Sequence, residues 1–170
     1  LGSGHHVPPS VGYLVEKAVL SALGRDGVPL SLLDRMGLEP PSQGSANMHL
    51  KVIHFSTEPV GLVFDRPVLL IPVAYNYAHV DGVIVYRSSE GTHTVIGIQV
   101  TTTPANKHQA SLAFLAGPWR KFVPAQGEGT RCQAALCWIT PEEQLTGANL
   151  PQFQAYPRQG HLPLTEFVDS

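Results

Sequence analysis

The chain has 170 residues, of which 43% are hydrophobic and 14% are charged, and its formal net charge is −2 at pH 7. This composition excludes a chain that is disordered throughout, and the length is that of about one domain. A net charge so close to zero gives no general attraction to nucleic acid or to acidic membranes, so any site for a polyanion must be local. No apolar run approaches the roughly 20 residues that cross a bilayer. We expect residues 1–3 (LGS) to be a vector remnant and residues 4–170 to form a single domain.

The first predicted element is an amphipathic helix over residues 11–23, VGYLVEKAVLSAL. Its apolar residues recur with the i, i+3, i+4, i+7 spacing of a helix that buries one face. Ser10 is a suitable N-cap, and Gly24 is predicted to end the helix. Glu16 lies at the border of the apolar stripe, where both a functional carboxylate and a plain surface carboxylate fit.

A β-rich stretch follows a short helix (SLLDRMGL) and a loop (EPPSQGSAN). Runs of β-branched residues between turn signals predict strands. These strands are MHLKVIHFS, GLVFDRPVLLIPVA with its two prolines, and the two halves of HVDGVIVYRSSEGTHTVIGIQVTTT.

The second half of the chain returns to a helix and then to a strand. Residues 105–122, ANKHQASLAFLAGPWRKF, predict a helix that breaks or kinks at Gly117 and Pro118. Residues 131–140, RCQAALCWIT, predict a strand in which Cys132 and Cys137 point to opposite faces, because their spacing is odd. A short helical segment is expected at EEQL, and the proline- and glycine-rich tail receives no assignment. This order predicts an α/β sandwich with helices on both faces of a mixed sheet of about four to five strands.

The hairpin contains two polar residues among apolar neighbours, Asp81 and Gln99. If Arg87 pairs with His93, the loop SSEGT closes the hairpin and Asp81 lies opposite Gln99 on one face. Thr101 then lies on that face too. A slip of one residue would separate these side chains. An alternative is that Asp81 and Gly82 belong to a bulge or early turn and that Gln99 is hydrogen-bonded at a sheet edge.

An aligned carboxylate and amide oxygen suggest a site for a hard cation. A buried carboxylate costs several kcal/mol unless it is paired or binds a metal. Mg²⁺ prefers oxygen ligands and keeps several of its waters. The sequence therefore predicts Mg²⁺, or Mn²⁺, near Asp81 and Gln99.

The order of helix with Glu16, strand with Asp81, strand with Gln99 and Thr101, and following helix resembles the restriction-endonuclease-like PD-(D/E)xK nuclease superfamily. It is most similar to the nuclease-like domains of Crinkler effectors and of kinetoplastid retrotransposon hot spot proteins. The resemblance covers residues 12–153 and implies a three-layer restriction-endonuclease-like sandwich. It also implies a metal-dependent nuclease acting on DNA or RNA, in which Asp81, residue 99 and the main-chain oxygen of Val100 hold the metal. The resemblance also implies a nuclear location, either in the producing cell or, for a secreted effector, in a host nucleus.

Two positions depart from the usual superfamily pattern. Gln99 replaces a glutamate and brings no charge, and Thr101 replaces a lysine and cannot polarise water as a cation does. Lys107 and His108 are candidates to supply the missing cation or base, unless they belong to a solvated helix start. A degenerate fold that binds nucleic acid or a protein partner without cleavage is the alternative function.

One basic and aromatic cluster, Trp119, Arg120 and Lys121, is a candidate contact for nucleic acid. An exposed helix end of ordinary composition fits the same three residues.

Overall fold

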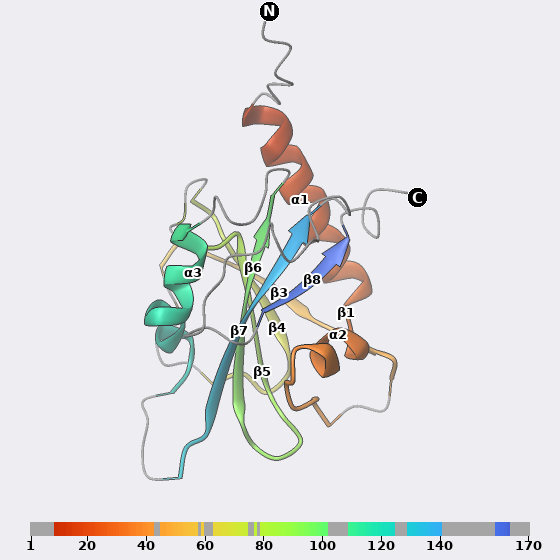
Figure 1. Ribbon diagram of the computed structural model, residues 1–170, viewed down its shortest axis with the longest axis vertical. Coiled ribbons are helices and arrows are strands. Elements are labelled where there is room, and N and C mark those ends of the chain that lie inside the picture. The colour runs from red at the N-terminus through yellow and green to blue at the C-terminus, as the bar shows by residue number, and fades with distance from the viewer. Residues whose placement is uncertain are drawn as a thin grey trace, which may run out of the picture.

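A computed structural model describes residues 9–42, 45–57, 59, 63–74, 77, 79–101, 109–124, 129–140 and 159–163. In this part of the chain a mixed sheet lies between helices on its two faces, as Figure 1 shows. The α/β class is therefore confirmed. The main sheet has six strands, where about four to five were predicted.

The elements follow one another in an order close to the predicted one. They are α1 (Pro9–Asp26), β1 (Val28–Pro29), α2 (Leu30–Arg35), β2 (Asn47–Met48), β3 (Lys51–Phe55), β4 (Val68–Pro72), β5 (Gly82–Arg87), β6 (His93–Val100), α3 (Gln109–Ala116), the 3₁₀ helix η2 (Pro118–Phe122), β7 (Cys132–Thr140) and β8 (Gln159–Pro163).

The main sheet has the order β3-β4-β5-β6-β7-β8, and β1 pairs with β2 in a separate small sheet. β4, β5 and β6 form an antiparallel meander. β7 runs parallel to β6, and β8 runs parallel to β7. A parallel neighbour requires a crossover, and α3 with η2 lies in the connection from β6 to β7.

Each face of the sheet is covered by its own helices, so both faces are core. Leu20 of α1 and Leu33 of α2 pack with Ile84 and Ile98 on one face. On the other face Phe114 of α3 packs with Val83 of β5 and Val95 of β6. Because both faces are buried, the strands carry apolar residues at successive positions rather than in strict alternation.

The first helix is longer than the sequence predicted. It runs to Asp26, and Gly27 ends it with φ +79°. Gly24 was therefore the wrong end point. A Cβ at Gly24 would lie 2.5 Å from Cγ2 of Val52, so this glycine lets the helix approach β3 closely instead of terminating it. Ser10 lies inside the helix, which begins at Pro9, a residue suited to a first turn.

The hairpin register agrees with the prediction. Arg87 pairs with His93, Gly82 pairs with Ile98, and the loop between the strands is SSEGT. The break at Gly117 is also confirmed, because α3 ends at Ala116 and η2 begins at Pro118.

β8 was missed by the sequence prediction. Its five residues, QGHLP, carry no run of β-branched side chains, and the strand exists by pairing with the edge of β7. The segment EEQL lies outside the described residues.

Candidate functional site

Asp81 and Gln99 meet at the end of the sheet where β5 begins. Asp81 lies in a bend directly before β5, and its backbone N–H donates to the carbonyl of Ile98 at 2.8 Å. β6 continues to Val100 because its last two residues pair with β7. The alternative prediction is partly correct, because Asp81 lies in a bend, but Gly82 is already the first residue of β5. Gln99 lies in an interior strand and not at a sheet edge.

The Asp81 carboxyl group accepts two hydrogen bonds through Oδ2. One comes from the backbone N–H of Val100 at 2.8 Å, and the other comes from Nε2 of Gln99 at 3.0 Å. Nε2 of Gln99 also donates to the main-chain oxygen of Val100 at 3.1 Å. The three groups that the sequence assigned to a metal therefore lie together, connected by hydrogen bonds.

Glu16 joins this cluster from α1. A Cβ at Gly82 would lie 3.1 Å from Cδ2 of Leu20, so the glycine permits α1 to pack closely on the start of β5. Leu20 is one helical turn after Glu16, and the two residues share a helix face. The close packing brings the Glu16 carboxyl group within hydrogen-bonding reach of Asp81.

Burial raises the pKa of both carboxyl groups, and the charge of Glu16 also raises the pKa of Asp81. Burial, followed by the charge of Glu16, raises the pKa of Asp81 from 3.8 to about 8, against the opposing hydrogen bond from Val100. Burial also raises the pKa of Glu16, whereas its hydrogen bond with Asp81 lowers it. The pair therefore shares a proton at neutral pH.

Lys17 is a cation near this pair that the sequence prediction missed. Its charge lowers the pKa of both Glu16 and Asp81, and its Nζ lies 5.3 Å from the centre of the Tyr13 ring. The position directly after Glu16 was the available signal.

Ser111 of α3 fixes the orientation of the Gln99 amide. Its Oγ donates to Oε1 of Gln99 at 2.7 Å, and the residue is only 3% exposed. Gly97 allows α3 to come this close, because a Cβ there would lie 2.9 Å from the ring of Phe114. A serine inside the apolar helix QASLAFLA was a signal for this role that the prediction did not use.

Replacing Ser111 by alanine is expected to lower the free energy of unfolding by about 1 kcal/mol, because Oε1 of Gln99 loses a buried partner. Urea denaturation followed by circular dichroism measures this change. The exposed Ser31 of α2 offers a control, for which Ser31→Ala is expected to change stability by less than about 0.5 kcal/mol. An equal decrease in the free energy of unfolding in the two variants would show that the Ser111 hydrogen bond does not stabilise the fold.

The amide orientation affects how a cation would fit. Gln99 presents its NH₂ group to Asp81, whereas a metal ligand must present oxygen. Turning the amide by half a rotation would present Oε1, and the Ser111 hydroxyl could then accept from Nε2, because a hydroxyl both donates and accepts. With the carboxyl groups of Asp81 and Glu16 and the oxygen of Val100, the donors are all hard oxygens and fit Mg²⁺.

No group of three or more His, Cys, Asp or Glu side chains placed to hold a metal ion occurs within the described part of the chain. The cluster at Asp81 has two such carboxyl side chains, and its remaining oxygen donors are an amide and a main-chain carbonyl.

The other predicted site residues lie in different surroundings. Thr101 is 6% exposed and its backbone N–H donates to the carbonyl of Ile139, so its place at the end of β6 is clear while its role stays a prediction. Lys107 and His108 lie outside the described residues.

The basic and aromatic cluster does not present its aromatic ring to solvent. Trp119 is 8% exposed and packs in the core, and the guanidinium of Arg120 lies 4.8 Å from the centre of its ring. Arg120 and Lys121 are exposed. A nucleic-acid contact here stays a prediction that depends on the two charges and not on stacking.

No family model, curated protein or solved structure matches this chain. None of the helices in the described ranges combines the length and the hydropathy needed to cross a bilayer.

Proposed function

We propose that this chain is a metal-dependent nuclease-like domain that hydrolyses phosphodiester bonds of nucleic acid. The observation that carries the proposal is the convergence of Glu16, Asp81, Gln99 and the Val100 carbonyl at one end of the sheet. They come from α1, the bend before β5 and the end of β6, in the order on which the resemblance to PD-(D/E)xK domains rests. The following α3 and the parallel β7 continue that order.

Mg²⁺ would be held by Asp81, Gln99 and the main-chain oxygen of Val100, with Glu16 in support. When bound, the cation would stabilise negative charge that develops on the phosphoryl group. Lys17 would add a positive charge beside the carboxyl pair. This charge would replace the lysine that the superfamily usually has at the position of Thr101. Ser111 would hold Gln99 in place, and loss of the shared proton would give Asp81 its full negative charge.

A binding module without catalysis is the second candidate function. The observation that favours it is the Gln99 NH₂ group, which donates to Asp81 and so stabilises the site without a cation. A neutral amide at position 99 and a hydroxyl at position 101 also reduce the charge available for catalysis. The domain would then bind nucleic acid, or a protein partner, and leave it intact.

Cleavage of plasmid and single-stranded substrates, with Mg²⁺ or Mn²⁺ and with EDTA, tests the two candidates. The wild type is expected to cleave only with metal, and Asp81→Ala is expected to reduce cleavage to background. Asp81→Asn serves as the second variant, because asparagine can still accept from Val100 and Gln99 and preserve the fold.

Equal cleavage by the wild type and both variants would indicate a contaminating nuclease and contradict the proposal. Binding of substrate without cleavage would favour the binding module. Nuclear localisation belongs to the same proposal and is tested by imaging the tagged full-length protein.

A further inference from the structure

A second candidate site lies at the opposite end of β5 from Asp81. A hollow is lined there by Pro41, Ser42, Phe64, Asp65, Arg66, Pro67 and Arg87, and we call it the arginine pocket. Arg87 is the last residue of β5, whereas Asp81 precedes its first residue. Because a strand rises about 3.3 Å per residue, the two sites are separated by roughly 20 Å.

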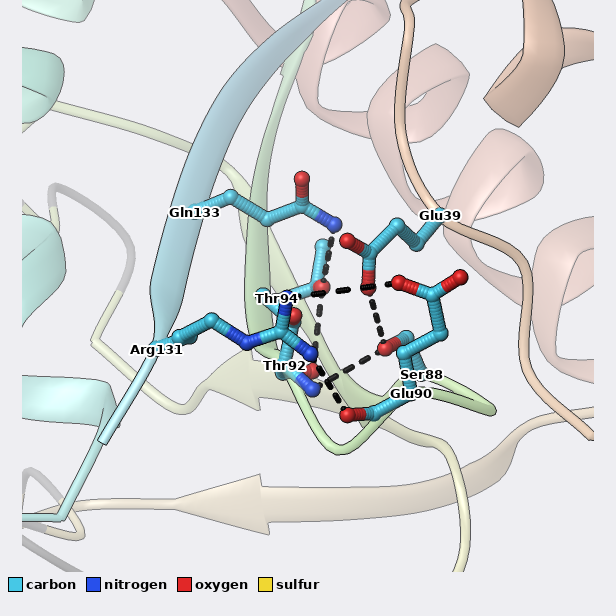
Figure 2. A network of polar contacts seen from close by, with 7 residues as sticks. All are labelled: Glu39, Ser88, Glu90, Thr92, Thr94, Arg131 and Gln133. Carbon is cyan, nitrogen blue, oxygen red and sulfur yellow. Dashed lines mark hydrogen bonds and ion pairs between the residues drawn. The ribbon is translucent and has the colours of Figure 1, made fainter. Parts of the chain in front are cut away.

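A hydrogen-bonded network fixes one wall of the arginine pocket. Figure 2 shows Glu39 and Ser88 facing each other, and the Ser88 hydroxyl donates to the Glu39 carboxylate at 2.7 Å. Tyr86 donates to the main-chain oxygen of Glu39 at 2.6 Å, and the backbone N–H of Ser89 donates to the oxygen of Pro40 at 3.0 Å. These contacts join the loop that contains Pro41 to the hairpin, so the wall is formed before any ligand arrives.

The hairpin loop is itself held by further contacts. The backbone N–H of Thr92 donates to Ser88 Oγ at 3.0 Å, and Arg131 donates to the main-chain oxygen of Glu90 at 2.7 Å (Figure 2). The Ser88 hydrogen bond is also the main reason that the pKa of Glu39 is lowered. The Glu39 carboxylate is therefore already engaged with the hairpin.

The two arginines of the arginine pocket line the same hollow and, like Arg35 of α2, are unpaired within the described part of the chain. Arg131 is paired with Glu90, and Arg25 is paired with Asp26, but Arg66 and Arg87 form no hydrogen bond or ion pair with any residue that the structure describes. Both side chains are exposed. Two guanidinium groups beside a hydroxyl, that of Ser42, provide the donors that recognise a phosphate group.

We propose that the arginine pocket binds a phosphate group through Arg66, Arg87 and Ser42. Its volume of about 130 Å³ is below the roughly 300 Å³ at which sites for drug-sized ligands begin, so one phosphate group enters and the rest of the ligand stays outside. Pro41 and Pro67 are buried and form an apolar floor, and Phe64 is half-buried beside them. The phosphate belongs either to a nucleic-acid backbone or to a small phosphorylated molecule. The proposal does not depend on the nuclease function.

Titration with inorganic phosphate at about 0.15 M salt, followed by NMR shifts of the arginine side chains, tests the site. Saturable binding is expected for the wild type. The double substitution Arg66→Gln with Arg87→Gln is expected to weaken phosphate binding at least tenfold, because it removes two charge-assisted contacts. The matched control removes the same charge elsewhere, through Arg25→Gln with Arg35→Gln, and is expected to bind as the wild type does.

A substitution at Asp65 tests the site by an expected gain, rather than a loss, of phosphate affinity. Its exposed carboxylate lies in the lining and repels an anion, so Asp65→Asn is expected to tighten phosphate binding severalfold. Failure of the wild type to bind phosphate, or equal weakening in the pocket variant and the matched control, would overturn the proposal.

A short single-stranded oligonucleotide, tested in EDTA by fluorescence anisotropy, identifies the source of the phosphate. If inorganic phosphate competes with it and the pocket variant loses both, the site holds a nucleic-acid backbone. If the pocket variant loses only inorganic phosphate, the site serves a small phosphorylated molecule. Neither result depends on cleavage, so the site is judged separately from the proposed nuclease function.

Discussion

At about pH 9, Asp81→Asn is expected to be more stable than the wild type by about 2 kcal/mol or more. Burial and the neighbouring Glu16 raise the pKa of Asp81 to about 8, against 3.8 for an ordinary aspartate. Between these two values the folded protein binds a proton that the unfolded chain has lost. The stability of the wild type therefore falls as the pH rises through this range. Asparagine resembles the protonated carboxyl group and carries no charge at any pH.

Urea denaturation at about pH 4 and about pH 9 measures this effect. The two proteins are expected to differ little at the lower pH and to diverge at the higher pH, while the amide oxygen of the variant still accepts from the Val100 N–H. Asp34→Asn, at an exposed position of α2, is the control and is expected to follow the wild type at both pH values. Parallel curves for Asp81→Asn and the wild type would show that Asp81 ionises as an ordinary aspartate does. Such a result would remove the basis for the shared proton.

Gln99→Glu is expected to tighten Mg²⁺ binding about tenfold or more, because it adds a negative charge beside Asp81 and Glu16. The Ser111 hydroxyl can donate to the new carboxylate as it does to Oε1 of Gln99. Without metal, the third carboxyl group is expected to lower the melting temperature, because like charges meet in a partly buried site. Mg²⁺ is then expected to raise the melting temperature more in the variant than in the wild type.

Isothermal titration calorimetry and thermal unfolding with and without MgCl₂ measure the two effects. Ser31→Glu, at an exposed position of α2, adds the same charge away from the site and serves as the control. If Gln99→Glu and Ser31→Glu change Mg²⁺ affinity to the same extent, position 99 is not a metal ligand.

Most of the sheet was predictable from local patterns. The predicted hairpin register, with Arg87 opposite His93 and SSEGT as the loop, is confirmed, whereas a slip of one residue would have put Asp81 and Gln99 on opposite faces. The break at Gly117 followed from the proline after it. Both signals act over a few residues, so no knowledge of distant packing was required.

Two other predictions failed because distant packing decided them. Glycine is typical of a helix end, but Gly24 lies inside α1. A glycine is required there because Val52 of β3 lies too close for a side chain. β8 lacks the residues typical of a strand and forms by adding to the open edge of β7. In both cases the partner is remote in sequence, and local propensity is a weak guide.

The candidate site shows the same division. The sequence by itself determined that one hairpin register places Asp81 opposite Gln99, because strand periodicity and loop length are local properties, but it left a bulge or turn at Asp81 and Gly82 open. Only the tertiary structure decided that Glu16 shares a proton with Asp81, that Ser111 orients Gln99 and that Lys17 lies nearby. Those contacts require α1 and α3 to pack on opposite faces of the sheet at Gly82 and Gly97, and the angle and depth of such packing follow from the whole core.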